Sequence, residues 1–395
     1  MGNTTVPIVM AANDVYAPYL GVSMQSMCNH FSKKNQYQIF VLQEDISEIH
    51  KKKIKRQERE NVRIEFVDVT DIFDKIKIPT IGHLSKETAY RLIIGKLFSE
   101  YKKILYVDSD TIILRDLAEL YNLNINNYIL GVVRARLFKG SYEYIVEQLK
   151  IVPEKYFNAG VLLINNEALR TLAIGEKGLS MLKTGKYVCQ DQDVLNILCE
   201  DKVMYIDGRW NVEWEHLTGL GGEPIIDDTR VGTLEMLDDP YIVHFTTRIK
   251  PWMRPDIKLA EYFWEEARKS CFYEEILYQN LDSQSLFSLY LFPWSEVEPN
   301  SRIILYGYGK VGSTLYSQIL KTKYCRIVAV ADKKADEITG LTIPVIFTNE
   351  IISQDYDTVI ICVEQKKVAD TIKRELLELG VNGETIRWKS PINGR

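Results

Sequence analysis

Short apolar runs alternate with longer helical patterns along the first part of the chain. Strands are predicted over residues 5–12, 37–45 and 62–69, and the segments between them, 19–31 and 46–60, carry helical patterns. Strands that alternate with helices are typical of βαβ units and of a mostly parallel sheet. The pattern therefore predicts an α/β fold.

The short apolar runs continue toward the middle of the chain. Strands are expected over 103–108, 111–116, 156–166 and 241–247, and a helix over 191–201. The run that ends at Asp108 is of the type that forms a buried parallel strand, and α/β sheets bind their ligands at such strand ends.

The pattern changes after Trp264. Helical sequence from about Lys258 to Tyr290 ends at Pro293 and Pro299, because proline breaks regular structure. A second βαβ pattern then begins, with elements expected over 302–306, 309–320, 326–332, 343–346, 356–363 and 368–379. We therefore predict a first domain over residues 1–275, a helical, proline-containing linker over 276–300 and a smaller α/β domain over 301–395.

Composition and charge exclude several classes of protein. The chain has 395 residues and a formal net charge of −5, which argues against a nucleic-acid-binding protein. No stretch reaches the roughly 18 uninterrupted apolar residues of a membrane span. The N-terminus lacks the pattern of a secretory signal, and Val6 stands where myristoylation requires Ser or Thr. Six scattered cysteines without a CxxC pair favour reduced thiols and a cytoplasmic protein.

Two aspartates interrupt the apolar segment ILYVDSDTIILRDL. A buried carboxylate is costly unless it is paired or binds a metal, and alternate residues of an extended segment point the same way. Asp108 and Asp110 can therefore reach one cation, with a structural polar turn as the alternative. The same spacing recurs at 191–193, where Asp or Gln can cap the following helix, and at 355–357, where we expect solvated side chains.

A histidine far along the chain is the candidate third ligand. His30 and His50 lie in polar helical surroundings and are predicted at the surface, whereas His244 ends an apolar strand and precedes Lys250 on a turn. A hydrogen-bonded histidine is the alternative. Carboxylates with an imidazole suit Mn²⁺ better than Mg²⁺, although Mg²⁺ is not excluded. A divalent ion with a lysine is what a diphosphate leaving group requires.

Seven motifs in the right order over residues 6–265 resemble glycosyltransferase family 8, the retaining sugar transferases related to bacterial lipopolysaccharide galactosyltransferases and to glycogenin. The motifs are VMAANDVYA, ETAYRLIIGKLF, KILYVDSD, YFNAGVLLIN, CQDQDVLN, RWN and HFTTRIKPW. The resemblance implies a GT-A type nucleotide-sugar-binding fold, a mixed sheet flanked by helices, over residues 1–275. It also implies a smaller C-terminal Rossmann-like domain.

The family's site residues carry over by position. The resemblance implies that Mn²⁺ is held by Asp108, Asp110 and His244. It implies a uridine pocket of Ala11, Asn13 and Tyr16, with the Tyr16 ring available for stacking on uracil. Ser109 and Lys250 are implied contacts of the bound nucleotide, with Lys250 clamping the diphosphate. The donor sugar and the reaction centre are assigned to Arg91, Asn158, Asp191 and Gln192, and His83 falls at an acceptor contact. Arg91 pairing with a core carboxylate and Asn158 capping a strand end are the structural alternatives.

Three departures from the family pattern bear on the ligands. Asn13 stands where the family usually has Asp, but its amide oxygen can still accept the uracil N–H. Thr247 replaces a glycine that permits close approach of the backbone to phosphate. Arg134 and Arg136 stand where the lipopolysaccharide enzymes have an acidic acceptor contact, which indicates a different acceptor.

The implied reaction is transfer of a hexose, glucose or galactose, from a UDP-sugar to a hydroxyl acceptor, with retention at the anomeric carbon. In the favoured route the leaving phosphate takes the acceptor proton. The rival route forms a covalent intermediate on Asp191 or Gln192, and an amide is a poor nucleophile. The resemblance further implies a role in bacterial surface-glycan synthesis in the cytoplasm, at the inner face of the membrane.

The C-terminal part carries a glycine motif between a predicted strand and a helix. Gly307, Gly309 and Gly312 have G-x-G-x-x-G spacing, and Asp332 ends the next strand where a ribose-binding acid is expected. Because about 95 residues hold only half of a full dinucleotide fold, a docking or dimerising module is preferred over a nucleotide site. A homo-oligomer through this domain and a peripheral membrane association are left open.

Two readings of other classes remain at this point. An NAD(P)-dependent oxidoreductase would use the C-terminal glycines but leaves the Asp–Asp–His set unexplained. A non-catalytic nucleotide-sugar-binding scaffold would not need both the metal set and Lys250.

Overall fold

The computed structural model describes residues 4–76, 86–137, 139–213, 236, 238–246, 249–254, 257–284 and 290–391. Contacts divide the chain into two compact units. The larger comprises residues 1–46 and 51–271, and the smaller comprises residues 47–50 and 272–395. The described helices include none that is long and apolar enough to cross a membrane.

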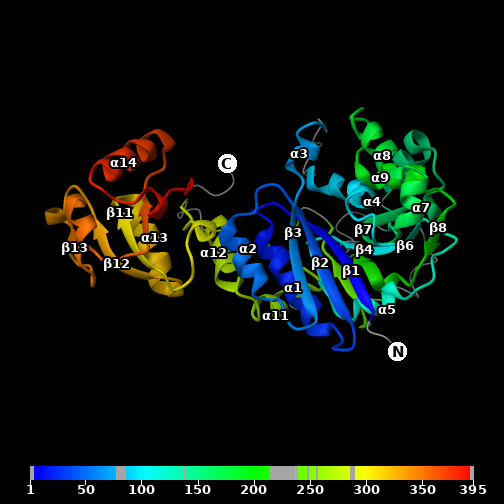
Figure 1. Ribbon diagram of the computed structural model, residues 1–395, viewed down its shortest axis with the longest axis horizontal. Helices are drawn as coiled ribbons and strands as arrows, with labels where there is room; N and C mark the ends of the chain where they lie inside the picture. Colours follow the sequence, from blue (N-terminus) through cyan, green and yellow to red (C-terminus); the bar gives the residue numbers. More distant parts are fainter. Residues whose placement is uncertain are drawn as a thin grey trace. The chain divides into compact units, whose positions relative to one another are not determined.

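The larger unit is built on a seven-stranded mixed sheet with the order β3-β2-β1-β4-β7-β6-β8 (Figure 1). Its strands are β1 (Thr5–Ala11), β2 (Gln36–Gln43), β3 (Val62–Asp68), β4 (Lys103–Val107), β6 (Leu130–Arg134), β7 (Phe157–Asn165) and β8 (Val203–Tyr205). Strands β3, β2, β1 and β4 are parallel, whereas β7 runs antiparallel to β4 and β6. The α/β fold class predicted from the sequence is confirmed.

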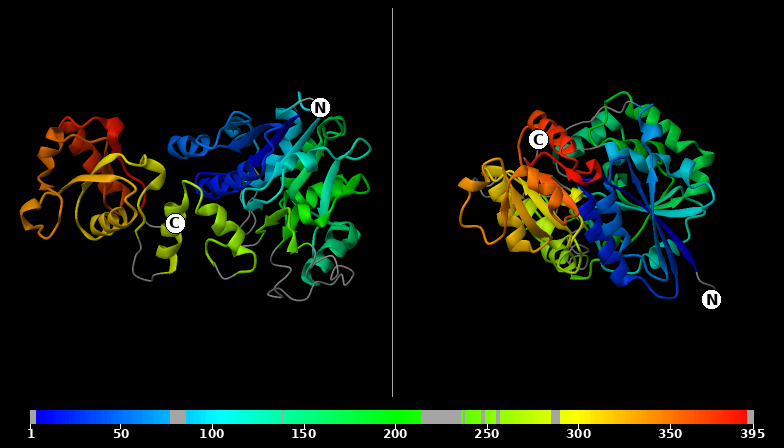
Figure 2. Two further views of the ribbon diagram at one scale, coloured as in Figure 1. Left: turned by 90° about the horizontal axis from the view of Figure 1, so that it is seen from below. Right: turned by 60° about the vertical axis from the view of Figure 1, so that its left-hand side comes forward.

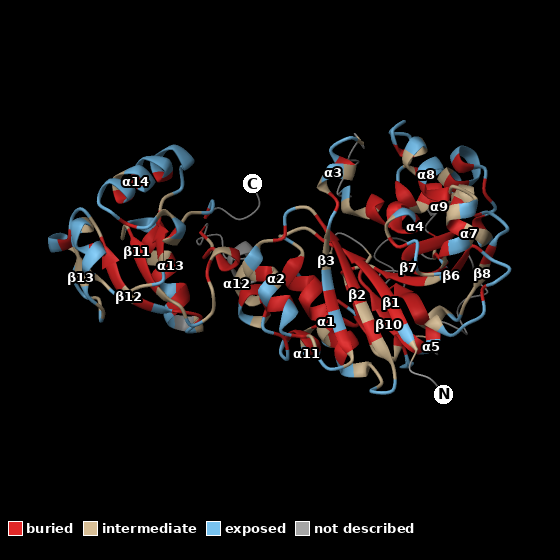
Figure 3. Cartoon of the chain, in the orientation of Figure 1, coloured by how far each residue is buried: buried red, intermediate tan, exposed pale blue. Residues whose placement is uncertain are grey.

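Helices cover both faces of this sheet. Figure 1 shows α1 (Ala17–His30) and α2 (Glu48–Lys55) on one side, and α4 (Ile94–Leu97), α7 (Asn166–Thr171), α8 (Ile174–Leu182) and α9 (Asp191–Leu198) on the other. Alternate residues of a strand face opposite sides, so Val9, Tyr106 and Leu162 pack into one apolar core under the second group of helices. Because both faces are covered, the central strands are buried almost throughout (Figure 3).

A second, three-stranded sheet closes one side of the larger unit. It contains β5 (Thr111–Ile113), β10 (Ile242–His244) and β9 (Val212–Glu213), in the order β5-β10-β9. Strand β10 pairs antiparallel with β5, with His244 opposite Thr111, and parallel with β9. This sheet brings the end of β10 beside the loop that follows β4.

Shorter helices complete the larger unit. They are α3 (Thr70–Phe73), the 3₁₀ helix over Lys86–Ile93, α5 (Leu117–Tyr121), α6 (Lys139–Tyr144), the 3₁₀ turn over Gly208–Asn211 and α11 (Ala260–Ala267). The helix expected over residues 46–60 ends at Lys55, and the helical region expected over 258–290 contains α11 and α12 (Tyr273–Gln284) as separate helices.

The smaller unit contains a five-stranded, wholly parallel sheet with the order β13-β12-β11-β14-β15. Its elements are β11 (Arg302–Tyr306), α13 (Lys310–Thr322), β12 (Arg326–Ala331), β13 (Val345–Ile346), β14 (Thr358–Ile361), α14 (Lys366–Glu378) and β15 (Ile386–Arg387). Ile303 and Leu305 pack under α13, while Ile304 and Tyr306 pack under α14, so the helices lie on opposite faces (Figure 2). This is the parallel α/β arrangement expected from the second βαβ pattern.

Part of the segment expected as a linker belongs to the core of the smaller unit. Phe292, Trp294 and Val297 are buried and pack with residues of β11 and α13. Aromatic side chains of this size bury much apolar surface, so the segment contributes to the stability of the unit.

The prediction that His50 lies at the surface is wrong. Its side chain is 2% exposed, and its Nε2 lies 3.0 Å from Glu275 Oε1. The lysine-rich sequence around His50 resembles a solvated helix face, and the distant carboxylate that permits its burial gives no local signal. His30 is half-buried, with its Nδ1 2.9 Å from the carbonyl oxygen of Ser26.

Candidate active site

A cavity of about 1110 Å³ lies where β1 and β4 end and β7 begins. It is lined by all the described residues that the family resemblance implies: Ala11, Asn13, Tyr16, Arg91, Asp108, Ser109, Asp110, Asn158, Asp191, Gln192, His244 and Lys250. His83 and Thr247, which the sequence also singled out, lie outside the described residues. Residues from distant parts of the sequence thus meet in one hollow.

Asp108 directly follows β4, and one of its two carboxylate oxygens is held by hydrogen bonds. Its Oδ1 accepts hydrogen bonds from Arg91 Nη2 at 2.9 Å and from the Tyr106 hydroxyl at 2.7 Å. Burial raises the pKa of Asp108, and the guanidinium of Arg91 opposes that shift. With Oδ1 occupied, Oδ2 is the oxygen that lies toward His244, at 3.7 Å from Nε2.

Asp110 lies between the ammonium group of Lys250 and the imidazole of His244. Its Oδ1 lies 3.2 Å from His244 Nε2, and its Oδ2 accepts from Lys250 Nζ at 2.7 Å. Burial alone would raise the pKa of Asp110, but the nearby Lys250 and His244 hold it well below its usual range. Lys250 Nζ also donates to the carbonyl oxygen of Phe245, so the ammonium group is fixed at the end of β10.

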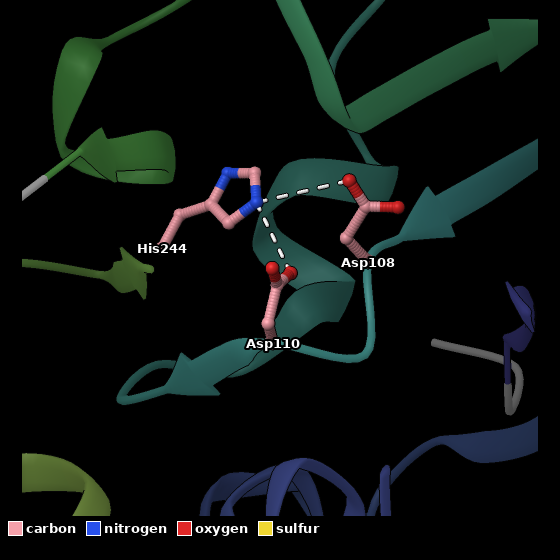
Figure 4. Close-up of side chains that lie close together, drawn as sticks. All are labelled: Asp108, Asp110 and His244. Carbon is pink, nitrogen blue, oxygen red and sulfur yellow. Dashed lines mark ion pairs between the residues drawn. The ribbon is translucent and has the colours of Figure 1, made fainter. Parts of the chain in front are cut away.

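Asp108, Asp110 and His244 have the chemistry of a divalent cation site (Figure 4). One ligand atom from each residue lies within 4.8 Å of the others. Two carboxylates and an imidazole offer hard oxygen and borderline nitrogen donors, a set that suits Mn²⁺ and similar ions. The residues present therefore fit a divalent metal ion.

Gly160, in β7, leaves room for this cluster. A Cβ built on it would overlap the His244 ring at Cε1 and would lie 2.7 Å from Asp108 Oδ2. The backbone of β7 thus forms a wall of the site, and a side chain at this position would fill it. Gly160 lies in the motif YFNAGVLLIN, but no local pattern in the sequence indicates its role.

Asp191 and Arg91 connect the candidate cation ligands with the start of α9. Arg91 Nε lies 2.9 Å from Asp191 Oδ2, and its guanidinium also donates to the carbonyl oxygen of Ala159. Arg91 is 5% exposed, and its charge is balanced by the carboxylates of Asp191 and Asp108. Gln190 is the N-cap of α9 and forms no side-chain capping hydrogen bond, whereas Asp193 Oδ2 accepts from the Cys189 backbone N–H at 2.8 Å, just before the helix. Of the 191–193 pair, Asp193 therefore bonds the backbone at the start of α9.

The buried position of Asp191 predicts a pH dependence of stability. Burial raises its pKa to about 6, although Arg91 opposes the shift. The folded protein therefore retains this proton up to about pH 6, whereas the unfolded chain releases it near pH 4. Between these values the folded state binds more protons, so the free energy of unfolding falls as pH rises, by an amount on the order of 3 kcal/mol.

Urea unfolding of the metal-free protein from pH 4 to pH 7 tests this. In Asp191→Asn, which cannot titrate at this position, the fall across that range is expected to be smaller by the same amount. An unchanged pH profile in the variant would contradict the assignment.

Gln192 is held by its neighbours. Its Oε1 accepts from the Ala159 backbone N–H at 3.0 Å, and its Nε2 donates to the Tyr156 hydroxyl at 3.1 Å. The amide oxygen is therefore already engaged with the protein. Within the 191–193 pair, Asp193 is buried and accepts from the hydroxyls of Tyr144 and Tyr156.

Aromatic side chains also line the cavity. The rings of Tyr19 and Trp252 stack with centroids 3.8 Å apart, and Tyr16 contacts both rings edge-on. Asn13 Oδ1 accepts from the Tyr16 backbone N–H at 3.0 Å. Because an amide oxygen has two lone pairs, this bond leaves one acceptor site. Tyr19 and Trp252 were not assigned a role from the sequence.

The third Asp-x-Asp pair lies outside this site. Asp355 and Asp357 belong to the smaller unit and pair with Arg302. The side chain of Asp355 is 86% exposed. The prediction that this pair is solvated is confirmed.

In the smaller unit, the glycine loop forms a tight turn that leaves little space for a side chain at Gly312. Gly307 has a φ of 94°, and a Cβ on Gly312 would collide with the carbonyl oxygen of Gly307. Asp332 accepts from the backbone N–H of Tyr308 at 2.7 Å and of Lys334 at 3.0 Å. The glycines thus permit a tight strand-to-helix turn, and both Asp332 oxygens are engaged with the backbone.

Comparisons with known proteins define the class. The crystal structure of the galactosyltransferase LgtC in complex with donor and acceptor sugar analogs superposes with a TM-score of 0.57 and 28% identity, covering 67% of this chain and 96% of that chain. The larger unit therefore has the fold of a GT-A type glycosyltransferase. The model of glycosyl transferase family 8 matches residues 7–255, more than half of the chain, and the chain belongs to that family. A model described as C2185-like, N-terminal, matches residues 299–387.

Two curated proteins are similar to the chain. General stress protein A of Bacillus subtilis is 28% identical over 258 residues, which are 62% of this chain and 86% of that protein. The lipopolysaccharide 1,3-galactosyltransferase of Salmonella typhimurium is 28% identical over 186 residues, or 44% of this chain. The match spans about half of that enzyme, 52% of its length.

Proposed function

We propose that this glycosyltransferase moves a hexose from a UDP-sugar to a hydroxyl acceptor, with retention at the anomeric carbon and with Mn²⁺ as cofactor. The observation that carries the proposal is the convergence of Asp108, Asp110 and His244 in the cavity that also contains Asn13 and Tyr16. The donor and acceptor sugar analogs named for LgtC, and the galactosyl transfer named for the Salmonella relative, support a sugar donor and a saccharide acceptor.

In this proposal different residues of the cavity bind different parts of the donor. Tyr16 and Asn13 hold the uracil through ring contact and the remaining lone pair of the amide oxygen. Ser109 and Lys250 lie beside the cation ligands, where the diphosphate is expected, and Lys250 neutralises part of its charge. When bound, a divalent cation supplies further positive charge that stabilises the departing diphosphate. Arg91, Asn158, Asp191 and Gln192 face the donor sugar.

The front-face route fits the contacts of the reaction-centre residues. In that route the bond between the anomeric carbon and the UDP oxygen breaks, the acceptor oxygen bonds to the same face, and the leaving phosphate oxygen takes the acceptor proton. A covalent route needs a free nucleophile, but Gln192 Oε1 accepts a backbone hydrogen bond and Asp191 is paired with Arg91. These contacts favour the front-face route.

The setting of the reaction is part of the proposal. The cysteines of the described residues form no disulfide, which suits a reducing cytoplasm, and the relatedness to a lipopolysaccharide enzyme supports surface-glycan synthesis. The oxidoreductase alternative gains no support, since Asp332, its expected ribose ligand, bonds to the backbone.

Release of UDP from a panel of UDP-sugars, measured with and without Mn²⁺, tests the proposed function. We expect release from UDP-glucose or UDP-galactose that depends on Mn²⁺ and increases with a saccharide acceptor. No release from any UDP-sugar in the presence of Mn²⁺ would reject the donor assignment, and equal release after removal of divalent metal would reject the cofactor.

A further inference from the structure

A buried chain of hydrogen bonds leads from the backbone of β7 to the imidazole of His244. The Gly160 N–H donates to Asn158 Oδ1 at 2.8 Å, and Asn211 Nδ2 donates to the same oxygen at 2.8 Å. Asn211 Oδ1 lies 2.8 Å from His244 Nδ1. Asn211 is 3% exposed and His244 is 2% exposed.

The direction of every bond in this chain follows from its first donor. A backbone N–H can only donate, so the atom of Asn158 that faces Gly160 must be its oxygen. The atom of Asn211 that faces this oxygen must then be its NH₂ group, which turns the Asn211 oxygen toward His244. That oxygen can only accept, so Nδ1 of His244 must carry the hydrogen.

We propose that Asn211 is a positioning residue that fixes His244 in the tautomer with hydrogen on Nδ1, so that the Nε2 lone pair faces Asp108 and Asp110. Metal-binding histidines usually donate their other N–H to an oxygen, which orients the ring and raises its basicity. Asn211 ends the 3₁₀ turn before β9, and β9 pairs with β10, so its distance from His244 is set by the sheet. The inference rests on the proposed function only for the identity of the cation.

The same chain determines which group Asn158 offers to the cavity. Its oxygen accepts two bonds from within the protein, whereas among the described residues its Nδ2 has no hydrogen-bond partner. Asn158 lines the cavity, so it presents a donor there. The ligand atom that meets Asn158 is therefore an acceptor, such as a hydroxyl or phosphate oxygen.

The Mn²⁺ affinity of two Asn211 variants tests the inference. Binding is measured from the concentration of free Mn²⁺, which electron paramagnetic resonance detects. Asn211→Ala removes the acceptor for Nδ1–H and is expected to weaken Mn²⁺ binding about 10–100-fold. Asn211→Asp keeps an oxygen for that hydrogen, and binding is expected to stay within about threefold of the wild type. Asn166→Ala is the matched control, because Asn166 is a buried asparagine whose side chain, among the described residues, bonds only to the backbone carbonyls of Phe98 and Tyr101.

Thermal unfolding of each variant separates loss of fold from loss of the site. The control is expected to be less stable than the wild type but to bind Mn²⁺ equally well. Wild-type Mn²⁺ affinity in Asn211→Ala, or equal losses in the Ala and Asp variants, would overturn the inference.

The tautomer can also be measured in the unmodified protein. With ¹⁵N-labelled histidines and Zn²⁺ as a diamagnetic probe, we expect the His244 ring to carry hydrogen on Nδ1 and to coordinate through Nε2. Hydrogen on Nε2 of the neutral ring would reject the role of Asn211 even if no variant folds. If the wild type binds no Mn²⁺, the cofactor proposal fails, and the tautomer measurement still decides the role of Asn211.

Discussion

Replacing Asp108 with asparagine is expected to reduce UDP-sugar turnover at least about a thousandfold. The carboxylate is one of three groups placed to hold the cation, and its Oδ1 is fixed by Arg91 and Tyr106 so that Oδ2 faces the site. Stabilisation of a leaving group by a metal ion contributes several kcal/mol, and each 1.4 kcal/mol is about tenfold in rate. An amide of the same shape lacks the charge that holds the ion. UDP release at saturating donor, with Mn²⁺ present, measures the loss.

The third Asp-x-Asp pair of the chain, residues 355–357, provides a matched control for the Asp108→Asn change. Asp355→Asn makes the same chemical change at an exposed position of the smaller unit, where the carboxylate pairs only with Arg302 among the described residues. Turnover is expected to stay at the wild-type level in this variant. Activity that survives in Asp108→Asn would remove the basis for the metal assignment.

Replacing Gly160 with alanine is expected to abolish Mn²⁺ binding, a loss of more than about 100-fold in affinity, and to lower the free energy of unfolding by about 1–3 kcal/mol. The added methyl group would occupy the space of His244 Cε1 and lie 2.7 Å from Asp108 Oδ2. Both groups must move, and β7 cannot retreat because it is paired on both sides. Mn²⁺ titration and urea unfolding measure the two effects.

A second glycine separates these two effects. Gly131 lies in β6, where a Cβ would come 3.2 Å from Leu163 Cβ but would meet none of the cation ligands. Gly131→Ala is therefore expected to lose stability while it keeps its Mn²⁺ affinity. If Gly160→Ala binds Mn²⁺ like the wild type, the close approach of β7 to the site is not a requirement.

Local patterns predicted the candidate ligands and most strands of this protein, but not the strands β6, β8, β9 and β15. Asp108 was recognised because a carboxylate after an apolar run is costly without a partner, and the order of the motifs pointed to His244 and Lys250. The alternation of strands and helices was enough for the α/β class and for the second sheet. The described residues of the proposed site then meet in one cavity, because parallel strands place their ends at one edge of a sheet.

Features that depend on contacts between distant segments were beyond the sequence. The burial of His50 depends on Glu275, which belongs to another helix. The orientation of the Asn211 side-chain amide is set by the hydrogen bonds that link it through Asn158 to the Gly160 N–H. The spacing of the motif RWN does not reveal this orientation. Gly160 could be predicted only as part of a strand. The His244 ring that needs the space beside it belongs to β10, which is distant in the sequence.

The pairing of β5 with β10 has a consequence for synthesis of the chain. His244 lies opposite Thr111, and the Phe245 N–H donates to the carbonyl oxygen of Asp110 at 3.1 Å. A ribosome that adds about 5–20 residues per second makes Asp110 on the order of ten seconds before it makes His244 and Lys250. Arg91 is already present to pair with Asp108, but His244 and Lys250, the partners of Asp110, are not. We therefore expect the growing chain to acquire its cation site late, when β10 joins the edge of β5.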